Sequence, residues 1–226
     1  MVKLTYYGHA CFLIEGAGKQ ILVDPFVTGN PLAPVKKEQL KPDYIIVTHG
    51  HGDHFGDTTD IAKRSGATVV SNFEIASYAG NQGCKNHPLH IGGSAKFGFG
   101  TVKLTIAHHG SCLPDGTYGG NPTGALLEIE GKRIYHAGDT GLFYDMKLIG
   151  RKKVDVALLP IGDNFTMGPE DALEAVKLIE PTVVIPMHYS TFDIVKQEPE
   201  PFKRSVEKET KSKCVILKPG ESYDVR

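Results

Sequence analysis

The sequence predicts an α/β protein built from two similar halves. Short apolar runs come first in hairpins and then alternate with helical segments, and this order occurs twice along the chain. We expect one domain over residues 1–226, with halves at about 1–100 and 101–226, because 226 residues amount to roughly 1.5 average domains and no linker interrupts the chain. A chain this long can bury a sizeable core without disulfides.

In the first half, alternating apolar residues predict strands, and glycine or proline marks their ends. Strands are expected at residues 3–7, 10–15, 20–23, 44–48 and 67–70, and helices at 57–65 and 72–79. The first two strands flank Gly8-His9 and are typical of a hairpin. Asp57 or Thr58 is expected to cap the first helix, and Gly66 to end it in a left-handed conformation. Residues 80–100, rich in glycine and asparagine, are expected to form a loop.

The second half repeats the pattern. Strands are expected at residues 102–107, 125–130, 133–136, 154–159, 182–187 and a closing 213–218, and helices at 169–179 and 201–208. Proline at the first position of the helix at 169–179 favours that start, because its missing N–H is not needed there.

Charge and cysteine content limit the partners and the compartment. With 25 basic and 26 acidic residues the net charge is −1, which argues against a large nucleic-acid partner. No run approaches the ~20 apolar residues of a membrane span, and the N-terminus alternates like a strand rather than a signal peptide. Four cysteines without close spacing fit a reduced, cytoplasmic chain. Association into a homo-oligomer is left open.

A histidine-rich segment points to a metal site. Residues 48–54 read THGHGDH, so three imidazoles and one carboxylate lie within six positions, directly after the buried strand at 44–48. Two glycines allow the backbone to curl so that these side chains converge. Imidazole and carboxylate ligands without thiolates suit zinc, iron, manganese or nickel, and argue against a closed structural zinc site.

Histidine or aspartate follows other predicted strands as well. The strand at 102–107 runs into His108-His109, the one at 133–136 into Asp139, and the one at 182–187 into His188. Any one of these alone would be an ordinary loop or capping residue. Together with the end of the strand at 44–48, these make four strand ends with histidine or aspartate. They predict a shared metal site at one edge of the sheets.

These motifs, in this order, resemble the metallo-β-lactamase superfamily. Further segments resemble its poorly characterised branch of metal-dependent hydrolases (UPF0173-like), related to ascorbate-phosphate lactonases: GHACFLIE, ILVDPFVTGN, HPLHIGGS, HAGDTGLFYDMKLIG, PIGDNFTMGPEDA and PMHYSTF. The resemblance covers nearly the whole chain. It implies a four-layer αββα sandwich, with two mixed sheets face to face, helices outside and a two-metal site at one edge.

The resemblance also implies the metal ligands. One ion would be held by His49, His51 and His109, and the other by Asp53, His54 and His188, with Asp139 bridging both. His108 is the alternative to His109.

For other polar residues the sequence leaves two roles open. His9 is expected to act in catalysis, as a proton shuttle or substrate contact, or else to make a structural hydrogen bond. His136 either supports Asp139 or packs as an ordinary strand residue, and His87 and His90 are weaker candidates. Asp163 and Asn164 either orient a ligand histidine or form a turn.

The expected activity is hydrolysis by a hydroxide bridged between two divalent ions, with Asp53, Asp139 and His9 as catalytic residues. Two such ions bring four positive charges, and Asp53, Asp139 and the hydroxide remove three. The remaining positive charge favours a small anionic substrate such as a phosphodiester or cyclic nucleotide. The alternatives are a lactone or ester hydrolase and a catalytically idle metal-binding protein.

Better-known activities of the superfamily fit this sequence less well. A β-lactamase would need export, and a tRNA nuclease would need a basic extension. A glyoxalase-type thioesterase would need a longer C-terminal region, and an oxygen-reducing enzyme would need a flavin domain. None of these features is evident in the sequence.

Overall fold

Two seven-stranded β-sheets pack face to face in the computed structural model, which describes residues 1–226. The first sheet has the order β14 (Ser222–Val225), β1 (Val2–Tyr6), β2 (Phe12–Gly16), β3 (Lys19–Val23), β4 (Tyr44–Ile46), β5 (Thr68–Asn72) and β6 (Lys85–Leu89). The second has the order β13 (Lys213–Cys214), β12 (Val183–Met187), β11 (Val156–Pro160), β10 (Lys132–His136), β9 (Thr123–Ile129), β8 (Gly100–Ile106) and β7 (Ser94–Phe97).

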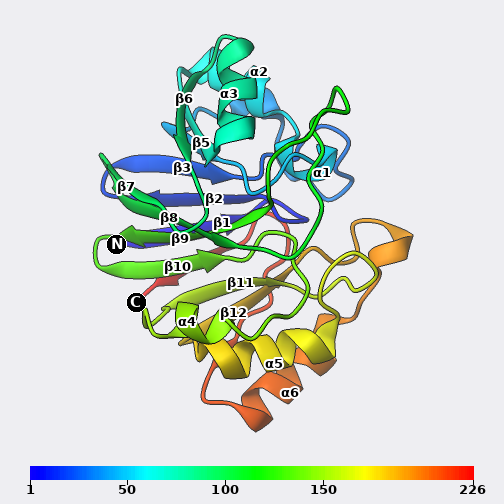
Figure 1. Ribbon diagram of the computed structural model, residues 1–226. Helices are drawn as coiled ribbons and strands as arrows, with labels where there is room; N and C mark the ends of the chain where they lie inside the picture. Colours follow the sequence, from blue (N-terminus) through cyan, green and yellow to red (C-terminus); the bar gives the residue numbers. More distant parts are fainter.

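Helices cover the outer faces of the two sheets. They are α2 (Thr58–Ser65), α3 (Phe73–Asn81), α4 (Met146–Gly150), α5 (Pro169–Ile179) and α6 (Pro199–Glu209), while the short helix α1 (Gly52–Phe55) follows β4. Figure 1 shows α2 and α3 on the side of the first sheet and α4, α5 and α6 on the side of the second. This αββα arrangement confirms the predicted fold class. No helix has the length and apolar character that a membrane crossing requires.

The strands of the first sheet send alternate side chains into two separate cores. Ile21 of β3 belongs to the larger core of 42 buried residues, whereas its neighbour Leu22 belongs to a second core of 17 residues. Ile46 and Ile45 of β4 divide in the same way. Because successive side chains of a strand point to opposite faces, the nearly all-apolar sequence of β4 corresponds to a strand buried on both sides.

Most predicted elements are present, with small shifts of their ends. The helix predicted at 57–65 is α2, and Gly66 follows it with a left-handed φ of +74°, as expected. Asp57 does not cap this helix through its side chain. Its carboxylate instead accepts hydrogen bonds from the backbone N–H groups of Val27 and Thr28, and so anchors the loop that follows β3.

Two predictions about the chain are wrong. Residues 80–100 are not all loop, because β6 and β7 form the outer strands of the two sheets. Both have mixed polar sequences with no buried residue, so they lack the apolar signal of a central strand. The closing strand at 213–218 shortens to β13, and the last strand is β14, which pairs antiparallel with β1.

The sheet topology brings the strand ends with polar residues to one edge. Strands β3, β4 and β5 are parallel to one another in the first sheet, as are β10, β11 and β12 in the second. Side chains that follow the carboxyl ends of parallel strands therefore gather at the same edge. In Figure 1 this edge carries α1 and the long loops, opposite the two chain termini.

Candidate metal centre

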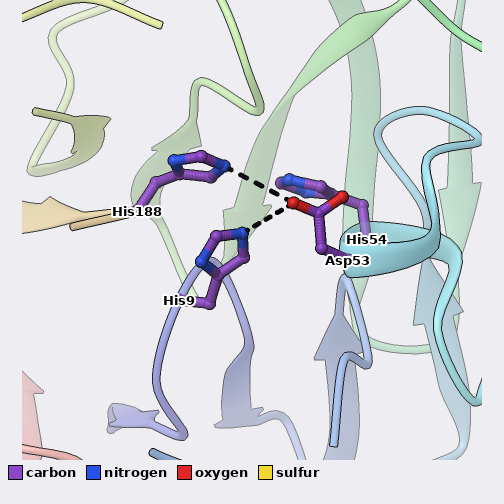
Figure 2. A group of neighbouring side chains, drawn as sticks. All are labelled: His9, Asp53, His54 and His188. Carbon is purple, nitrogen blue, oxygen red and sulfur yellow. Dashed lines mark hydrogen bonds and ion pairs between the residues drawn. The ribbon is translucent and has the colours of Figure 1, made fainter. Parts of the chain in front are cut away.

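All eight predicted site residues, His9 among them, form three overlapping groups at the sheet edge. The groups are His49, His51 and His109; His49, His54 and Asp139; and His9, Asp53, His54 and His188, and within each group the candidate ligand atoms lie within 4.8 Å of one another. Each residue follows a different strand or loop, apart from those in the segment after β4. Figure 2 shows Asp53 and His54 on α1 facing His9 and His188.

The first group consists of imidazoles only. His49 Nε2 lies 3.1 Å from His51 Nδ1, and His49 is buried while His51 and His109 are half-buried. His109 Nε2 lies 3.5 Å from Asp139 Oδ2. Three imidazole nitrogens beside a carboxylate form a donor set that suits divalent first-row metals.

Asp139 lies between this group and the group that contains Asp53, His54 and His188. Its Oδ1 is 3.1 Å from His54 Nε2, and its Oδ2 is 3.0 Å from His188 Nε2 and 3.9 Å from His49 Nε2. Asp53 Oδ2 lies 3.9 Å from His188 Nε2. Asp139 therefore faces ligand atoms of both groups, which is the placement that a shared carboxylate needs.

Several of these buried atoms have no hydrogen-bond partner, which tests whether the residues fit a metal. His54 Nε2, His188 Nε2 and Asp139 Oδ1 are all buried and unpaired within the protein. Buried polar atoms are nearly always satisfied, and each exception calls for an explanation such as a bound ion. Buried ligand atoms that lie within 4.8 Å of one another but form no hydrogen bonds fit a metal that would satisfy them.

Asp24 supports the second group, and its role was not predicted. It is fully buried directly after β3, its Oδ2 accepts a hydrogen bond from His54 Nδ1 at 2.8 Å, and its Oδ1 accepts one from the Thr48 N–H at 2.8 Å. A carboxylate fixes the proton on Nδ1, so the Nε2 lone pair faces the site. The signal for Asp24 in the sequence is an aspartate directly after the strand predicted at 20–23.

The electrostatics follow from this burial. Burial opposes protonation of His54, but the carboxylates of Asp139 and Asp24 outweigh it and raise the pKa of His54 well above its usual value. Burial alone would raise the pKa of Asp139, yet the His54 and His188 rings lower it well below the usual range. Burial lowers the pKa of His49 and His109, which are therefore neutral near pH 7.

Two glycines permit the close backbone approaches of the site. Gly138, with φ of +62°, shapes the turn that leads into Asp139, and a Cβ there would lie 2.7 Å from the Thr123 carbonyl oxygen. A Cβ on Gly50 would lie 2.8 Å from the Cys112 carbonyl oxygen. Larger residues at either position would push the strand-end loops apart.

The remaining histidines lie outside the three groups. His108 is exposed and packs against Phe143, with the ring centroids 5.1 Å apart, so it is His109 that the structure places in the cluster. His136 is buried; its Nε2 donates to the Ala10 carbonyl and its Nδ1 accepts from the Gly138 N–H. It therefore stabilises the turn before Asp139. His87 packs on Phe97, and His90 accepts a hydrogen bond from the next N–H.

Asp163 and Asn164 form a turn. Both have positive φ, and the Asp163 carboxylate accepts a hydrogen bond from the Asn164 N–H at 2.8 Å. The Asp163 N–H donates to the Met167 carbonyl, which closes the loop before α5. Their hydrogen bonds stay within this loop and do not orient a ligand histidine.

Comparison with known proteins identifies relatives along the whole chain. A family profile described as "Beta-lactamase superfamily domain" matches residues 3–188. A UPF0173 metal-dependent hydrolase of Pelotomaculum thermopropionicum is 55% identical over 99% of this chain and 100% of the relative. A second UPF0173 metal-dependent hydrolase, from Bacillus cytotoxicus, is 54% identical over 98% of this chain and 99% of the relative.

Solved structures share the whole fold. Igni18, a metallo hydrolase of the archaeon Ignicoccus hospitalis, is 41% identical with a TM-score of 0.91, covering 100% of this chain and 99% of that one. An isothiocyanate hydrolase from Delia radicum gut bacteria, at 24% identity and a TM-score of 0.78 over 98% of both chains, shares the fold. The chain thus belongs to the beta-lactamase superfamily, and within it to the UPF0173 family of metal-dependent hydrolases.

Proposed function

We propose that this protein hydrolyses a small anionic ester, such as a phosphodiester or cyclic nucleotide, with two divalent metal ions. The two donor sets would be His49, His51 and His109 on one side and Asp53, His54 and His188 on the other, with Asp139 shared. The observation that carries this proposal is the spacing of the imidazole rings.

Ring spacing separates the histidines into two sets. With a metal–nitrogen bond of about 2.1 Å, two imidazoles on one tetrahedral ion have ring centroids about 5.2 Å apart. His49 and His51 are 4.7 Å apart, and His109 lies 5.0 Å from each. His54 and His188 are 5.4 Å apart. His49 and His54 lie only 4.1 Å apart, too close for one ion, which supports their assignment to different ions.

The proposal gives a role to the ions and to each of the three aspartates. Ions bound here would polarise the scissile bond and lower the pKa of the attacking water to about 7. Asp139 would be shared by the two sets, because its Oδ2 lies 3.5 Å from His109 Nε2 of the first set and 3.0 Å from His188 Nε2 of the second. Asp24 orients His54 through Nδ1. Asp53 is one-third exposed, so it lies at the opening of the site, where it can orient the water.

The charge of the site supports an anionic substrate. Among the seven proposed ligands only Asp53 and Asp139 are charged, and the other ligands are neutral imidazoles when they bind a metal. Two divalent ions would therefore leave net positive charge in a mostly buried site. Such a charge attracts a phosphodiester and stabilises the negative charge that develops on it.

Apolar surface on both sides of the site supports a substrate with an apolar ester group. Phe192 is 40% exposed and its ring centroid lies 5.7 Å from that of His9. On the other side, a hollow of about 310 Å³ beside His109 is lined by Ile91 and Ile106 among others. These walls could hold the organic group of an ester whose charged centre lies at the metals.

The test is hydrolysis of bis(p-nitrophenyl) phosphate by chelator-treated protein to which manganese, nickel, zinc or iron is returned one at a time. We expect turnover that depends on the metal and that is lost in Asp139→Asn. Full activity in Asp139→Asn with both ions bound would contradict the two-ion proposal. Uptake of two ions without diester turnover, but with lactone hydrolysis, would favour the alternative of a lactonase. Uptake with neither activity would indicate a metal-binding protein without catalysis.

A further inference from the structure

His9 lies in contact with the second donor set although that set is complete without it. It lies in the turn between β1 and β2, is fully buried, and has a left-handed φ of +58°. A buried non-glycine residue with positive φ is strained, and such strain persists where the surrounding structure holds the residue for a purpose. Figure 2 shows its ring directed toward Asp53, beside His188.

The hydrogen bonds of His9 define which nitrogen carries the proton. His9 Nε2 lies 3.1 Å from Asp53 Oδ2, and His9 Nδ1 lies 2.9 Å from Thr191 Oγ1. A carboxylate oxygen accepts, so Nε2 carries the hydrogen and donates it to Asp53. Nδ1 then accepts from the Thr191 hydroxyl. A chain of two hydrogen bonds therefore runs from Thr191 through His9 to Asp53.

His9 does not fit as a ligand of the same ion as His188. Its ring centroid lies 3.9 Å from that of His188, whereas His54 and His188 are 5.4 Å apart. Two imidazoles at 3.9 Å would subtend only about 75° at one ion with bonds of about 2.1 Å. In addition, Nε2 uses its hydrogen toward Asp53 and has no free lone pair in this state.

The backbone of His9 also holds His188. The His188 N–H donates to the His9 carbonyl at 2.7 Å, and His188 has a left-handed φ of +55° itself. His9 belongs to the first sheet and His188 follows β12 of the second. The His9 turn therefore joins the two sheets at the point where ligands from both must meet.

We propose that His9 is a positioning residue for the second ion: its Nε2–H holds the Asp53 carboxylate in the orientation that binds metal, and Thr191 fixes the required tautomer. This inference rests on the proposed two-ion function. It departs from a proton shuttle, because both nitrogens of His9 already have partners within the protein.

Two substitutions separate this role from a merely conformational one. The amide nitrogen of glutamine reaches about as far as Nε2 of histidine, whereas that of asparagine reaches only about as far as Nδ1. Asparagine, however, adopts the left-handed conformation at position 9 more readily than glutamine does. If the hydrogen bond to Asp53 matters, His9→Gln should retain the second ion better than His9→Asn. If only the backbone conformation matters, the order should be reversed.

The measurement is titration of metal-free protein with Co²⁺, followed by its visible absorption and by metal analysis. We expect wild type and His9→Gln to bind two ions with similar affinity. In His9→Asn the second ion should bind about 10- to 100-fold more weakly, the range for loss of a residue that orients a ligand, while the first ion is unaffected. Unchanged binding of the first ion shows that the variant is folded. The reversed order, or equal weakening of both ions, would overturn the assignment of His9.

Thr191→Val provides a second variant that leaves residue 9 unchanged. Without the hydroxyl, Nδ1 loses its donor, and we expect weaker binding of the second ion together with loss of the single Nε2–H tautomer of His9 in long-range ¹H–¹⁵N spectra. Unchanged tautomer and affinity would contradict the role of Thr191. If the wild-type protein binds no second Co²⁺, the proposed two-ion function itself fails, and this inference with it.

Discussion

Asp24 Oδ2 accepts a hydrogen bond of 2.8 Å from His54 Nδ1, and both side chains are fully buried. The pair connects the residue after β3 to α1. This helix follows β4, which is the neighbour of β3 in the first sheet. It leaves His54 Nε2 facing Asp139 at 3.1 Å, without a hydrogen bond to it. A carboxylate outside the ligand sets thus decides which nitrogen of His54 is free to bind metal.

Asp24→Asn should weaken metal binding although Asp24 is not a proposed ligand. The asparagine oxygen can still accept from the Thr48 N–H, but its NH₂ group would then donate to His54 Nδ1 and shift the proton of His54 to Nε2. We expect a loss of about 10- to 100-fold in affinity for the second ion, measured by competition with a chelator. Asp60→Asn, on an exposed carboxylate, is the control and should bind normally. Equal affinity of Asp24→Asn and wild type would refute the tautomer argument.

His108 and His109 provide a matched pair of neighbouring imidazoles. His109→Ala removes a nitrogen ligand that lies 3.5 Å from Asp139, whereas His108→Ala removes an exposed ring that packs on Phe143 and lies outside the three groups. We expect His109→Ala to lose more than about 100-fold in affinity for the first ion, beyond the range for residues that only orient ligands. His108→Ala should stay within a few-fold of wild type. Metal content after dialysis measures both, and a stronger effect of His108→Ala would reverse the assignment.

The metal-free protein should lose stability as the pH falls below about 6.5. Burial lowers the pKa of His9 to about 4 and also lowers those of His49, His109 and His136. Below about pH 6.5 these groups bind more protons in the unfolded chain than in the folded one, and each favours unfolding by at most about 1.4 kcal/mol per pH unit.

His54, Asp24 and Asp139 change the stability of the fold in other pH ranges. His54 has a raised pKa, so its contribution is fully present below about 6.5 and is lost only as the pH rises through its folded value. The lowered pKa values of Asp24 and Asp139 stabilise the fold above about pH 4, and this contribution disappears in stronger acid. Urea unfolding of chelator-treated protein between pH 5 and 8 measures the slope. A free energy of unfolding that stays constant from pH 7 to 5 would contradict the prediction.

Phe192→Ala should affect substrate binding more than turnover. Its ring is 40% exposed beside His9 and Phe26, where it could contact an aromatic ester group. We expect KM for bis(p-nitrophenyl) phosphate to rise about 2- to 10-fold, the range for loss of one aromatic contact, with kcat changed less. Phe73→Ala, on an exposed phenylalanine of α3, is the control. A fall in kcat at constant KM would show that Phe192 does not bind the ester group.

The sequence by itself predicted the fold class and the residues of the candidate site. Apolar runs such as 44–48 and their polar ends are local features. They can be recognised in the sequence because side chains along a strand follow a regular period. The segment after β4 places four candidate ligands within six residues, so its chemistry is evident without coordinates. Edge strands β6 and β7 were missed because they bury no side chain and thus have no apolar signal.

Only the tertiary structure decided how these residues are arranged around one another. The choice between His108 and His109 depends on which ring turns toward Asp139, and neighbours in sequence cannot show this. Asp24 and Thr191 are ordinary polar residues in the sequence, and their contacts with His54 and His9 span 30 and 182 positions. Hydrogen bonds between distant segments depend on how the two sheets pack, and that packing brings the ends of β1, β3, β4, β8, β10 and β12 to one edge.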